Sequence, residues 1–310
     1  MGKTIKLVFL LMIAMISLGL MGCGGDQASS GQVYFLLHND AGAGFNEDLK
    51  QALVNKAKEH GVTVEVLDGK SDSNMQLDQM NHVIAAKAGA VVVAAVDGDA
   101  IIPAVKKANE ADIPIIRVNR DINDGKFVSC ISDDKEAGRM QGEFMAQKLP
   151  PDARIIYMSG EMTQGAAIKR WEGFKEACLD KRPDVKLLAM ADCGWNRADA
   201  LKQMTLWLKI FPQIDGIVGA NDEMVLGAIQ ILKDNNRLNG VWSSGVDATD
   251  DALKAVQAGL MSQTVKQDAK GQGEGAWQLV QAALTGNKSS ADVVVPFMSI
   301  TSDNIGQFLK

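Results

Sequence analysis

The sequence predicts an α/β protein with two doubly wound lobes, each built on a parallel sheet. Short β-branched runs alternate with amphipathic stretches along the chain, and most of these runs are apolar on both faces, as strands covered by helices must be. The order glycine, strand, acidic turn and helix also occurs twice, from Gly89 to Asp97 and from Gly216 to Asp222. Two similar lobes are the simplest interpretation of this repetition.

Ten segments have the composition of buried strands. Their alternation with helical patterns is typical of a doubly wound fold. In chain order they are 33–38, 62–67, 90–96, 115–119, 127–131, 154–159, 185–191, 216–220, 241–246 and 261–267.

Several helix boundaries follow from local signals. Apolar spacing predicts a helix behind Asn74 as its N-cap. Asp99 and Pro103 are predicted to open the next helix along the chain, and Gly61 to end the helix that begins at Phe45.

Composition restricts the class of protein. The 310 residues are 46% apolar and 23% charged, which is typical of a globular chain with room for two domains. The net charge of −6 comes without a cluster of lysines or arginines, so nucleic acid is not expected as a partner. His38, His60 and His82 lie far apart without cysteine neighbours, so no metal site is expected.

The first 22 residues have the pattern of a secretory signal peptide. Two lysines precede an almost unbroken apolar run over 7–20, which is short for a membrane span and has the length of a signal core. The run ends in Leu-Met-Gly-Cys at 20–23, which resembles the lipobox of bacterial lipoproteins and implies lipidation of Cys23. Residues 23–32 are expected to form a polar tether. The protein is therefore predicted to be lipid-anchored in the periplasm or at the outer face of the cytoplasmic membrane, and an ordinary signal peptide with an incidental cysteine is the alternative.

Three further cysteines leave two interpretations open. Cys178 and Cys193 form a disulfide in an oxidising compartment, or both are small buried hydrophobic residues like Cys130.

Polar side chains follow most of the predicted strands. Ligands of open α/β sheets bind outside the carboxyl ends of the strands, so these residues form the candidate site. They are amides, carboxylates and guanidinium groups with two aromatic rings, without a Ser–His or Cys–His pair. Such groups match hydroxyls, which donate and accept, so the set predicts a sugar or polyol ligand. The candidate ligand-binding residues are Asn39, Asp40, Phe45, Asn119, Arg120, Arg170, Trp195, Asn221, Asp247 and Gln267.

From about residue 33 to its end, the chain resembles the monosaccharide-binding proteins of ABC importers, the ribose- and galactose-binding type of the type I periplasmic binding proteins. Three segments carry most of the resemblance, and the shorter stretches 245–247 and 264–267 follow in the right order. The three are Ala-Asn-Asp-Glu-Met-Val-Leu-Gly-Ala at 220–228, Ile-Pro-Ile-Ile-Arg-Val-Asn-Arg at 113–120 and Arg-Trp-Glu-Gly-Phe at 170–174.

The resemblance implies a fold, a site and a partner. It implies lobes of 33–131 with 268–295 and of 132–267 with 296–310, joined by a three-segment hinge. It assigns ligand contacts to Phe45, Asn119, Arg120, Arg170, Asn221, Asp247 and Gln267, with Trp195 as a stacking ring. The expected function is that of a monomeric receptor that delivers a monosaccharide or polyol to an ABC permease. No enzymatic activity and no cofactor are expected.

The sequence also departs from the family pattern. Ribose binders carry an aspartate where this chain has Asn119, and their first loop has two aromatic rings where this chain has only Phe45. Ribose, another pentose, a hexose and an inositol therefore all remain candidate ligands. The segment before Arg154 lacks the alternating acids of the galactose-type calcium loop, so no calcium is expected.

Other functions fit parts of the sequence. A sensor subunit for a chemoreceptor or membrane kinase would use the same site. A sugar-active enzyme would need a pair of carboxylates, and Asp40 with Asp247 is the available pair. The Gly-Ala-Gly stretch at 42–44 imitates a dinucleotide-binding turn, but Glu47 stands where its third glycine belongs.

Alternative structural roles also exist for single residues. Phe45 and Trp195 also fit core positions, and Arg120 and Arg170 also fit solvated surface positions. Asp222 is interpreted as a helix cap, and Asp97 and Asp99 are interpreted as turn and cap residues.

Overall fold

The computed structural model describes residues 31–40, 42, 44–287 and 291–309. The predicted signal peptide (1–22), Cys23 and most of the predicted tether lie outside the described residues. Gln32, the last residue of the predicted tether, already contacts the folded part of the chain, because its carbonyl accepts from the Gly89 N–H at 2.9 Å. No helix among the described residues combines the length and apolar composition that crossing a membrane requires.

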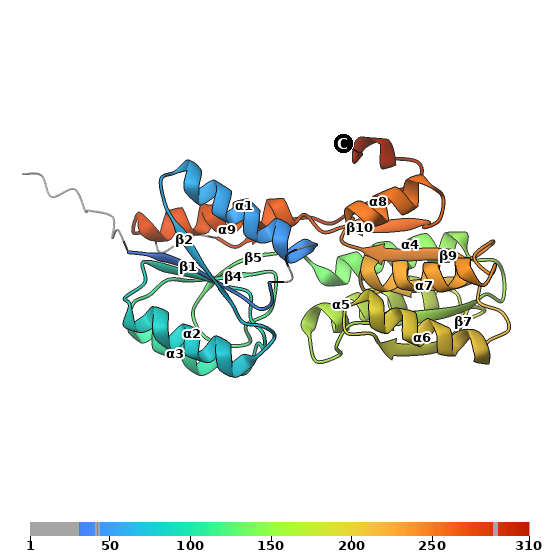
Figure 1. The fold of residues 1–310 in the computed structure, drawn as a ribbon, viewed down its shortest axis with the longest axis horizontal. Coiled ribbons are helices and arrows are strands. Elements are labelled where there is room, and N and C mark those ends of the chain that lie inside the picture. The colour runs from blue at the N-terminus through green and yellow to red at the C-terminus, as the bar shows by residue number, and fades with distance from the viewer. Residues whose placement is uncertain (1–30, 41, 43, 288–290, 310) are drawn as a thin grey trace, which may run out of the picture.

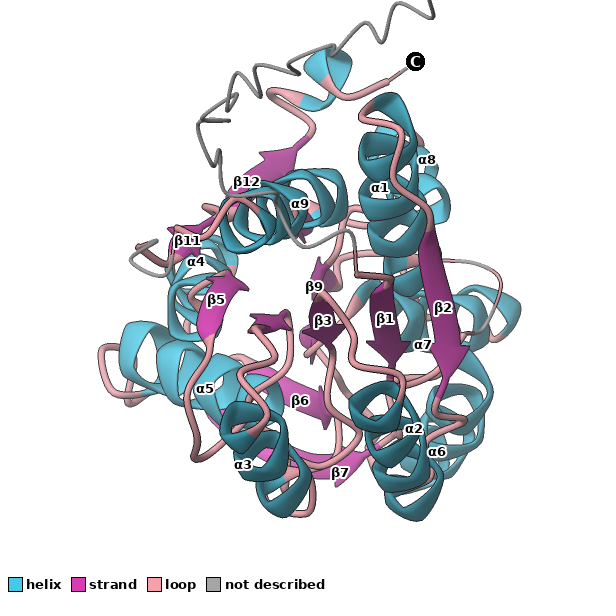
Figure 2. Cartoon of the chain, turned by 90° about the vertical axis from the view of Figure 1, so that its left-hand side faces the viewer, coloured by secondary structure: helices cyan, strands magenta, loops and turns pink. Residues whose placement is uncertain are grey.

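The first sheet has six parallel strands in the order β11-β5-β4-β3-β1-β2. Its strands are β1 (Val33–Leu37), β2 (Val64–Asp68), β3 (Ala90–Val93), β4 (Ile115–Val118), β5 (Val128–Ile131) and β11 (Val293–Val294). Helices α1 and α9 cover one face, and α2 and α3 cover the other (Figure 2). These helices are α1 (Phe45–Glu59), α2 (Ser73–Ala85), α3 (Ile102–Glu110) and α9 (Ala269–Leu284).

The second sheet also has six strands, in the order β12-β10-β9-β8-β6-β7, of which only β12 is antiparallel. Its strands are β6 (Arg154–Ser159), β7 (Lys186–Asp192), β8 (Gly216–Gly219), β9 (Trp242–Val246), β10 (Gln263–Lys266) and β12 (Met298–Thr301). Its helical segments are α4 (Asp134–Lys148), α5 (Gly165–Phe174), the π-helix η1 (Lys175–Leu179), α6 (Arg197–Ile210), α7 (Asp222–Asp234), α8 (Asp250–Gln257) and the 3₁₀ turn η2 (Ile305–Gln307).

The two sheet units lie side by side along the long axis of the molecule (Figure 1). The chain passes between them three times, from β5 to α4, from β10 to α9 and from β11 to β12. The first two passages are tied together, because Gln272 Nε2 donates to Ser132 Oγ at 2.8 Å. The predicted two-lobed α/β class is therefore confirmed, and all ten predicted strands are present. Two strands were not predicted: β11, whose two residues are too few for a periodic signal, and β12, which has the sequence Met-Ser-Ile-Thr.

Local signals placed the helix ends only approximately. The N-cap of α2 is Asp72, whose carboxylate accepts from the Asn74 N–H at 2.8 Å, so the assignment of Asn74 as the cap is wrong. Pro103 does lie in the first turn of α3. Asp99 does not cap this helix. Its N–H donates to Asp97 Oδ1 at 2.8 Å in the preceding turn.

The three cysteines that the structure describes are free thiols. Cys130, Cys178 and Cys193 are all buried and unbridged, which decides between the two interpretations in favour of small hydrophobic residues. Burial raises the pKa of the Cys130 thiol to about 12 and that of Cys178 to about 11.

Helices α4 and α5 pack with their backbones in contact. A Cβ at Gly138 on α4 would lie 2.0 Å from the Arg170 carbonyl oxygen on α5. Only a residue without a Cβ allows this approach. The contact brings the Arg170 side chain to the first turn of α4.

We predict that Gly138→Ala lowers the free energy of unfolding by about 1–3 kcal/mol, the usual cost of overpacking. This loss is expected although alanine favours a helix over glycine by up to about 1 kcal/mol. Urea denaturation measures the change. Gly306→Ala is the control, because a Cβ there meets no atom within 4 Å. Equal stability of the two variants would contradict the packing argument.

Candidate ligand-binding site

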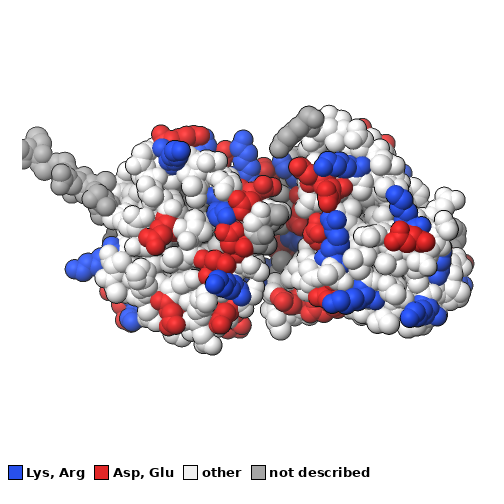
Figure 3. All heavy atoms as spheres, viewed as in Figure 1, with Lys and Arg blue, Asp and Glu red and all other residues white. Residues whose placement is uncertain are grey.

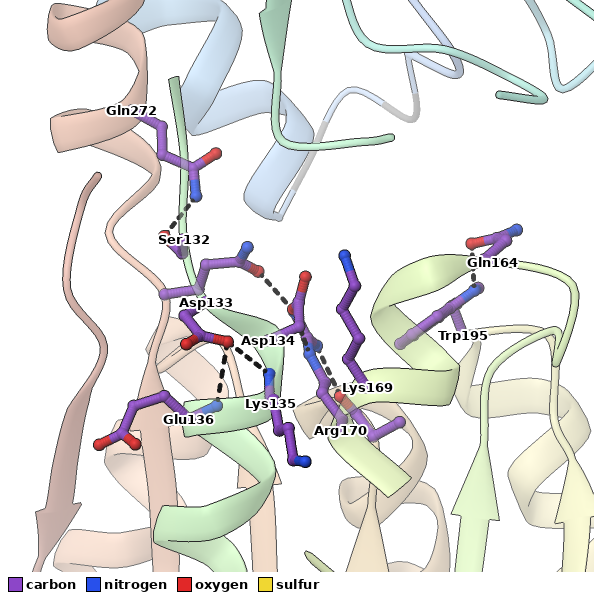
Figure 4. A network of polar contacts seen from close by, with 12 residues as sticks. Ser132, Asp133, Asp134, Lys135, Glu136, Gln164, Lys169, Arg170, Trp195 and Gln272 are labelled. Atoms are coloured by element: carbon purple, nitrogen blue, oxygen red, sulfur yellow. Dashed lines mark hydrogen bonds and ion pairs between the residues drawn. The ribbon is translucent and has the colours of Figure 1, made fainter. Parts of the chain in front are cut away.

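Arg170 joins several predicted site residues at the strand ends of the second sheet. Its side chain is 4% exposed. Its Nε donates to Asp134 Oδ1 at 2.8 Å (Figure 4). Nη1 donates to the Ala220 carbonyl at 2.7 Å and Nη2 to Gln267 Oε1 at 3.0 Å. The guanidinium therefore links α4, the end of β8 and the end of β10.

The Arg170–Asp134 contact is a buried ion pair. Burial raises the pKa of Asp134, and the nearby positive charge of Arg170 opposes this rise. The removal of one member of such a pair leaves an uncompensated buried charge, which is far more costly than the loss of a surface pair. Asp134 thus holds the Arg170 guanidinium in one orientation.

Trp195, on the loop after β7, lies next to the Arg170 side chain of α5. The Arg170 Cζ lies 5.6 Å from the centre of the Trp195 ring. The ring Nε1 donates to Gln164 Oε1 at 3.0 Å (Figure 4). The ring lies against backbone, since a Cβ at Gly160 would lie 1.9 Å from a ring carbon. Because its only polar atom is occupied, the half-buried ring has only its aromatic faces for other contacts.

Asn221 is the N-cap of α7. Its Oδ1 accepts from the Met224 N–H at 3.1 Å, and its Nδ2 donates to the Trp195 carbonyl at 2.9 Å. The interpretation of Asp222 as the cap is therefore wrong. Asp222 is fully buried and accepts from the Thr264 hydroxyl at 2.7 Å.

Asp247 follows β9 on the same side of the second sheet. Burial raises the pKa of its carboxyl to about 7, while the Arg170 charge lowers it and the carboxylates of Glu223 and Asp134 raise it further. A carboxyl of this kind accepts hydrogen bonds when ionised and donates one when protonated.

Asn119 and Arg120 follow β4 on the first sheet. Asn119 has a φ of 61°, in the left-handed region. Arg120 is half-buried, and its Nη2 donates to the Val96 carbonyl at 3.3 Å. Burial lowers the pKa of Arg120. Burial and the neighbouring Arg120 charge also lower the pKa of His38 to about 3, which keeps this imidazole neutral.

The first loop gives its predicted residues other partners. Both Asp40 oxygens accept from Lys50 Nζ, at 2.7 and 2.9 Å. Asn39 Nδ2 donates to Ser71 Oγ at 3.2 Å. Phe45 begins α1 and packs partly against the core. The ion pair with Lys50 compensates the charge of Asp40. This argues against Asp40 as one of the two carboxylates that a glycoside-hydrolysing site would need.

An ion pair connects the two sheet units beside the predicted arginines. Lys169 Nζ on α5 lies 3.1 Å from Asp121 Oδ2 on the loop after β4. Arg117 Nη1 contacts the other Asp121 oxygen at 3.0 Å. Because Asp121 follows Arg120 and Lys169 precedes Arg170, the pair brings the two segments that carry the predicted arginines close together. Acidic and basic side chains line both sides of the furrow between the units (Figure 3).

The structure thus groups the predicted residues into two surfaces. Arg170, Trp195, Asn221 and Gln267 form a connected set on the second sheet, with Asp247 close by. Among the described residues, the predicted site residues of the first sheet unit form no side-chain hydrogen bonds with one another, and ligand contact by all ten stays a prediction.

Sequence reasoning missed four residues of this region. Asp121 and Lys169 adjoin the predicted arginines in the sequence, and this adjacency was the available signal. Asp134 and Gln164 gave no signal, because an acid in the first turn of a helix and a polar loop residue are both common.

Comparisons with known proteins give a consistent picture. A family model described as a periplasmic binding protein domain matches residues 33–288. The chain is 32% identical over 258 residues to a protein from Rhizobium meliloti named as a putative rhizopine-binding protein, covering 80% of this chain and 82% of that protein. It is 30% identical over 300 residues to the xylitol-binding protein of Mycolicibacterium smegmatis, covering 94% and 84%.

A solved structure is similar over almost the whole chain. It is an ABC transporter solute-binding protein from Bacillus halodurans with bound myo-inositol. The TM-score is 0.85 at 29% sequence identity, with 92% of this chain and 98% of that chain covered.

We predict that Gly160→Ala lowers the free energy of unfolding by about 1–3 kcal/mol, because its methyl group would displace the Trp195 ring. The same substitution in a Trp195→Ala background should cost much less, because the ring is no longer in the way. A double-mutant cycle by urea denaturation measures this coupling. The same cost in both backgrounds would show that Gly160 does not position the ring.

Proposed function

The chain belongs to the periplasmic binding protein family, and we propose that it captures a monosaccharide or polyol between its two sheet units and delivers it to an ABC permease. Membership of this family makes the chain a binding protein and not an enzyme.

One observation carries the proposed site. Arg120 and Arg170 belong to different sheet units, and the Asp121–Lys169 ion pair joins the segments next to them. A small molecule between the sheets would therefore meet amide, carboxyl and guanidinium groups from both sides. The left-handed backbone at Asn119 and the anchored ring of Trp195 fit such a site, because they fix side-chain directions before a ligand arrives.

The named relatives support a neutral, hydroxyl-rich ligand. One relative is named for xylitol, and the similar solved structure holds myo-inositol. Charge-assisted hydrogen bonds from groups such as Arg170 and Asp247 contribute about 1.5–3 kcal/mol each. A ring such as Trp195 provides a flat apolar surface for the C–H face of a cyclic polyol.

Binding is proposed to close the two units about their three connections. The units would be 33–131 with 268–295 and 132–267 with 296–310, as the chain passages suggest. The Ser132–Gln272 bond ties two of these connections and would limit the paths along which the units move.

The proposed location is the periplasm or the outer face of the cytoplasmic membrane, with a lipid on Cys23. We expect that the exported protein incorporates radiolabelled palmitate and that Cys23→Ser abolishes the incorporation and releases the protein from membranes. Labelling that persists in Cys23→Ser would reject the lipid anchor.

The proposed function is tested by a thermal-shift screen of the chain without residues 1–22 against pentoses, hexoses, acyclic polyols and inositols. A ligand that binds only the folded state raises the melting temperature by mass action. We expect at least one compound to stabilise the protein at submillimolar concentration. If no compound of the panel raises the melting temperature, a sugar or polyol is rejected as the ligand.

The best compound then tests the site through Arg120→Ala. The loss of charge-assisted bonds from Arg120 is expected to weaken affinity by about tenfold or more in isothermal titration. Arg154→Ala is the matched control. Arg154 is exposed at the first residue of β6, whereas the proposed site lies at the carboxyl ends of the strands. Equal affinities in both variants would remove Arg120 from the site.

A further inference from the structure

Two of the proposed ligand residues on the second sheet unit, like Asn119 on the first, have a backbone conformation that residues with a side chain rarely adopt. Trp195 has a φ of 59°, and Asp247 has a φ of 125° followed by Ala248 at 60°. Residues with a Cβ are strained in this region, so such conformations persist only where the surrounding structure holds them. Both segments carry a side chain that is proposed to meet the ligand.

The first residues of α7 hold both segments. Asn221 Nδ2 donates to the Trp195 carbonyl at 2.9 Å. The next residue, Asp222, accepts at Oδ2 from the Thr249 N–H at 3.0 Å. One turn of helix is therefore bonded to the loop after β7 on one side and to the loop after β9 on the other.

Thr264 on β10 completes the contact with the second loop. Its hydroxyl donates to Asp222 Oδ1 at 2.7 Å and accepts from the Ala248 N–H at 3.1 Å. Both Asp222 and Thr264 are 0% exposed, so neither reaches a ligand. Gly245 on β9 leaves room for the carboxylate, since a Cβ there would lie 2.4 Å from Asp222 Oδ1.

The Asp222 carboxylate is buried without a cationic partner. No ion pair joins it to a lysine or arginine in the described part of the chain. Burial and the nearby Asp247 carboxylate raise its pKa. A buried carboxyl is unfavourable unless it is hydrogen-bonded, and the Asp222 carboxylate accepts hydrogen bonds from Thr249 and Thr264. The burial of the Asp222 carboxylate is therefore explained by its hydrogen bonds to the loop after β9 and to Thr264.

We infer that Asn221 and Asp222 are positioning residues that fix Trp195 and Asp247 for the ligand, with Thr264 as the third member of the Asp222 contact. This inference rests on the proposed function, because it adds a positioning role to Asn221, itself a predicted ligand contact, and assigns a role in ligand binding to Asp222 and Thr264, which are fully buried behind the site. At the N-terminus of α7, Asn221 thus holds the loop after β7 and Asp222 holds the loop after β9.

The test uses Thr264→Val, which removes the hydroxyl and nearly keeps the shape of the side chain. In the ligand-free protein, amide hydrogen exchange at Ala248 and Thr249 should become about tenfold faster or more relative to Ile217 and Val218, which report opening of the β8 core. Affinity for the best compound of the panel should fall by about tenfold or more.

Two variants separate positioning from general destabilisation. Thr264→Ser keeps the hydroxyl and should restore both the slow exchange and most of the affinity. Thr205→Val removes a hydroxyl from the exposed face of α6 and should leave both measurements unchanged.

Two outcomes would overturn the inference. One is unchanged relative exchange at Ala248 and Thr249 in Thr264→Val, and the other is faster exchange with wild-type affinity. If no compound binds the wild-type protein, the proposed ligand class is wrong. The exchange rates still decide whether Thr264 holds the loop.

Discussion

The buried guanidinium of Arg170 is the interaction on which the binding surface of the second sheet depends. It joins Asp134 on α4, the end of β8 and Gln267 after β10, so three separate segments share one set of hydrogen bonds. The close approach of α4 and α5 at Gly138 makes this possible. A long cationic side chain is held here because each of its three guanidinium nitrogens donates a hydrogen bond within the protein.

Electrostatics also relate the two sheet units to each other. Asp121 pairs with Arg117 of its own unit and with Lys169 of the other. Pairs of this kind, partly open to solvent, are weak and are screened by salt. The contact between the units therefore rests on interactions that are easily exchanged, which suits a protein proposed to open and close around a ligand.

Rigidity is concentrated on the surface that the ligand is proposed to meet. Trp195 and Asn119 both have left-handed backbone, and each stands at the end of a strand. The Trp195 ring is further fixed by Gln164 and by its contact with the Gly160 backbone. Directions fixed before binding reduce the entropy lost when a ligand is captured.

The sequence by itself determined the α/β class, the ten predicted strands and the strand-end position of Gln267, because apolar periodicity and strand ends are local properties of the chain. Only the tertiary structure decided which groups are partners. Asp40 is neutralised by Lys50, Asp222 holds the loop after β9 while Asn221 caps α7, and Asp121 meets Lys169 from the other sheet. These choices depend on distances between segments that are far apart in the sequence, and no local pattern of residues encodes such distances.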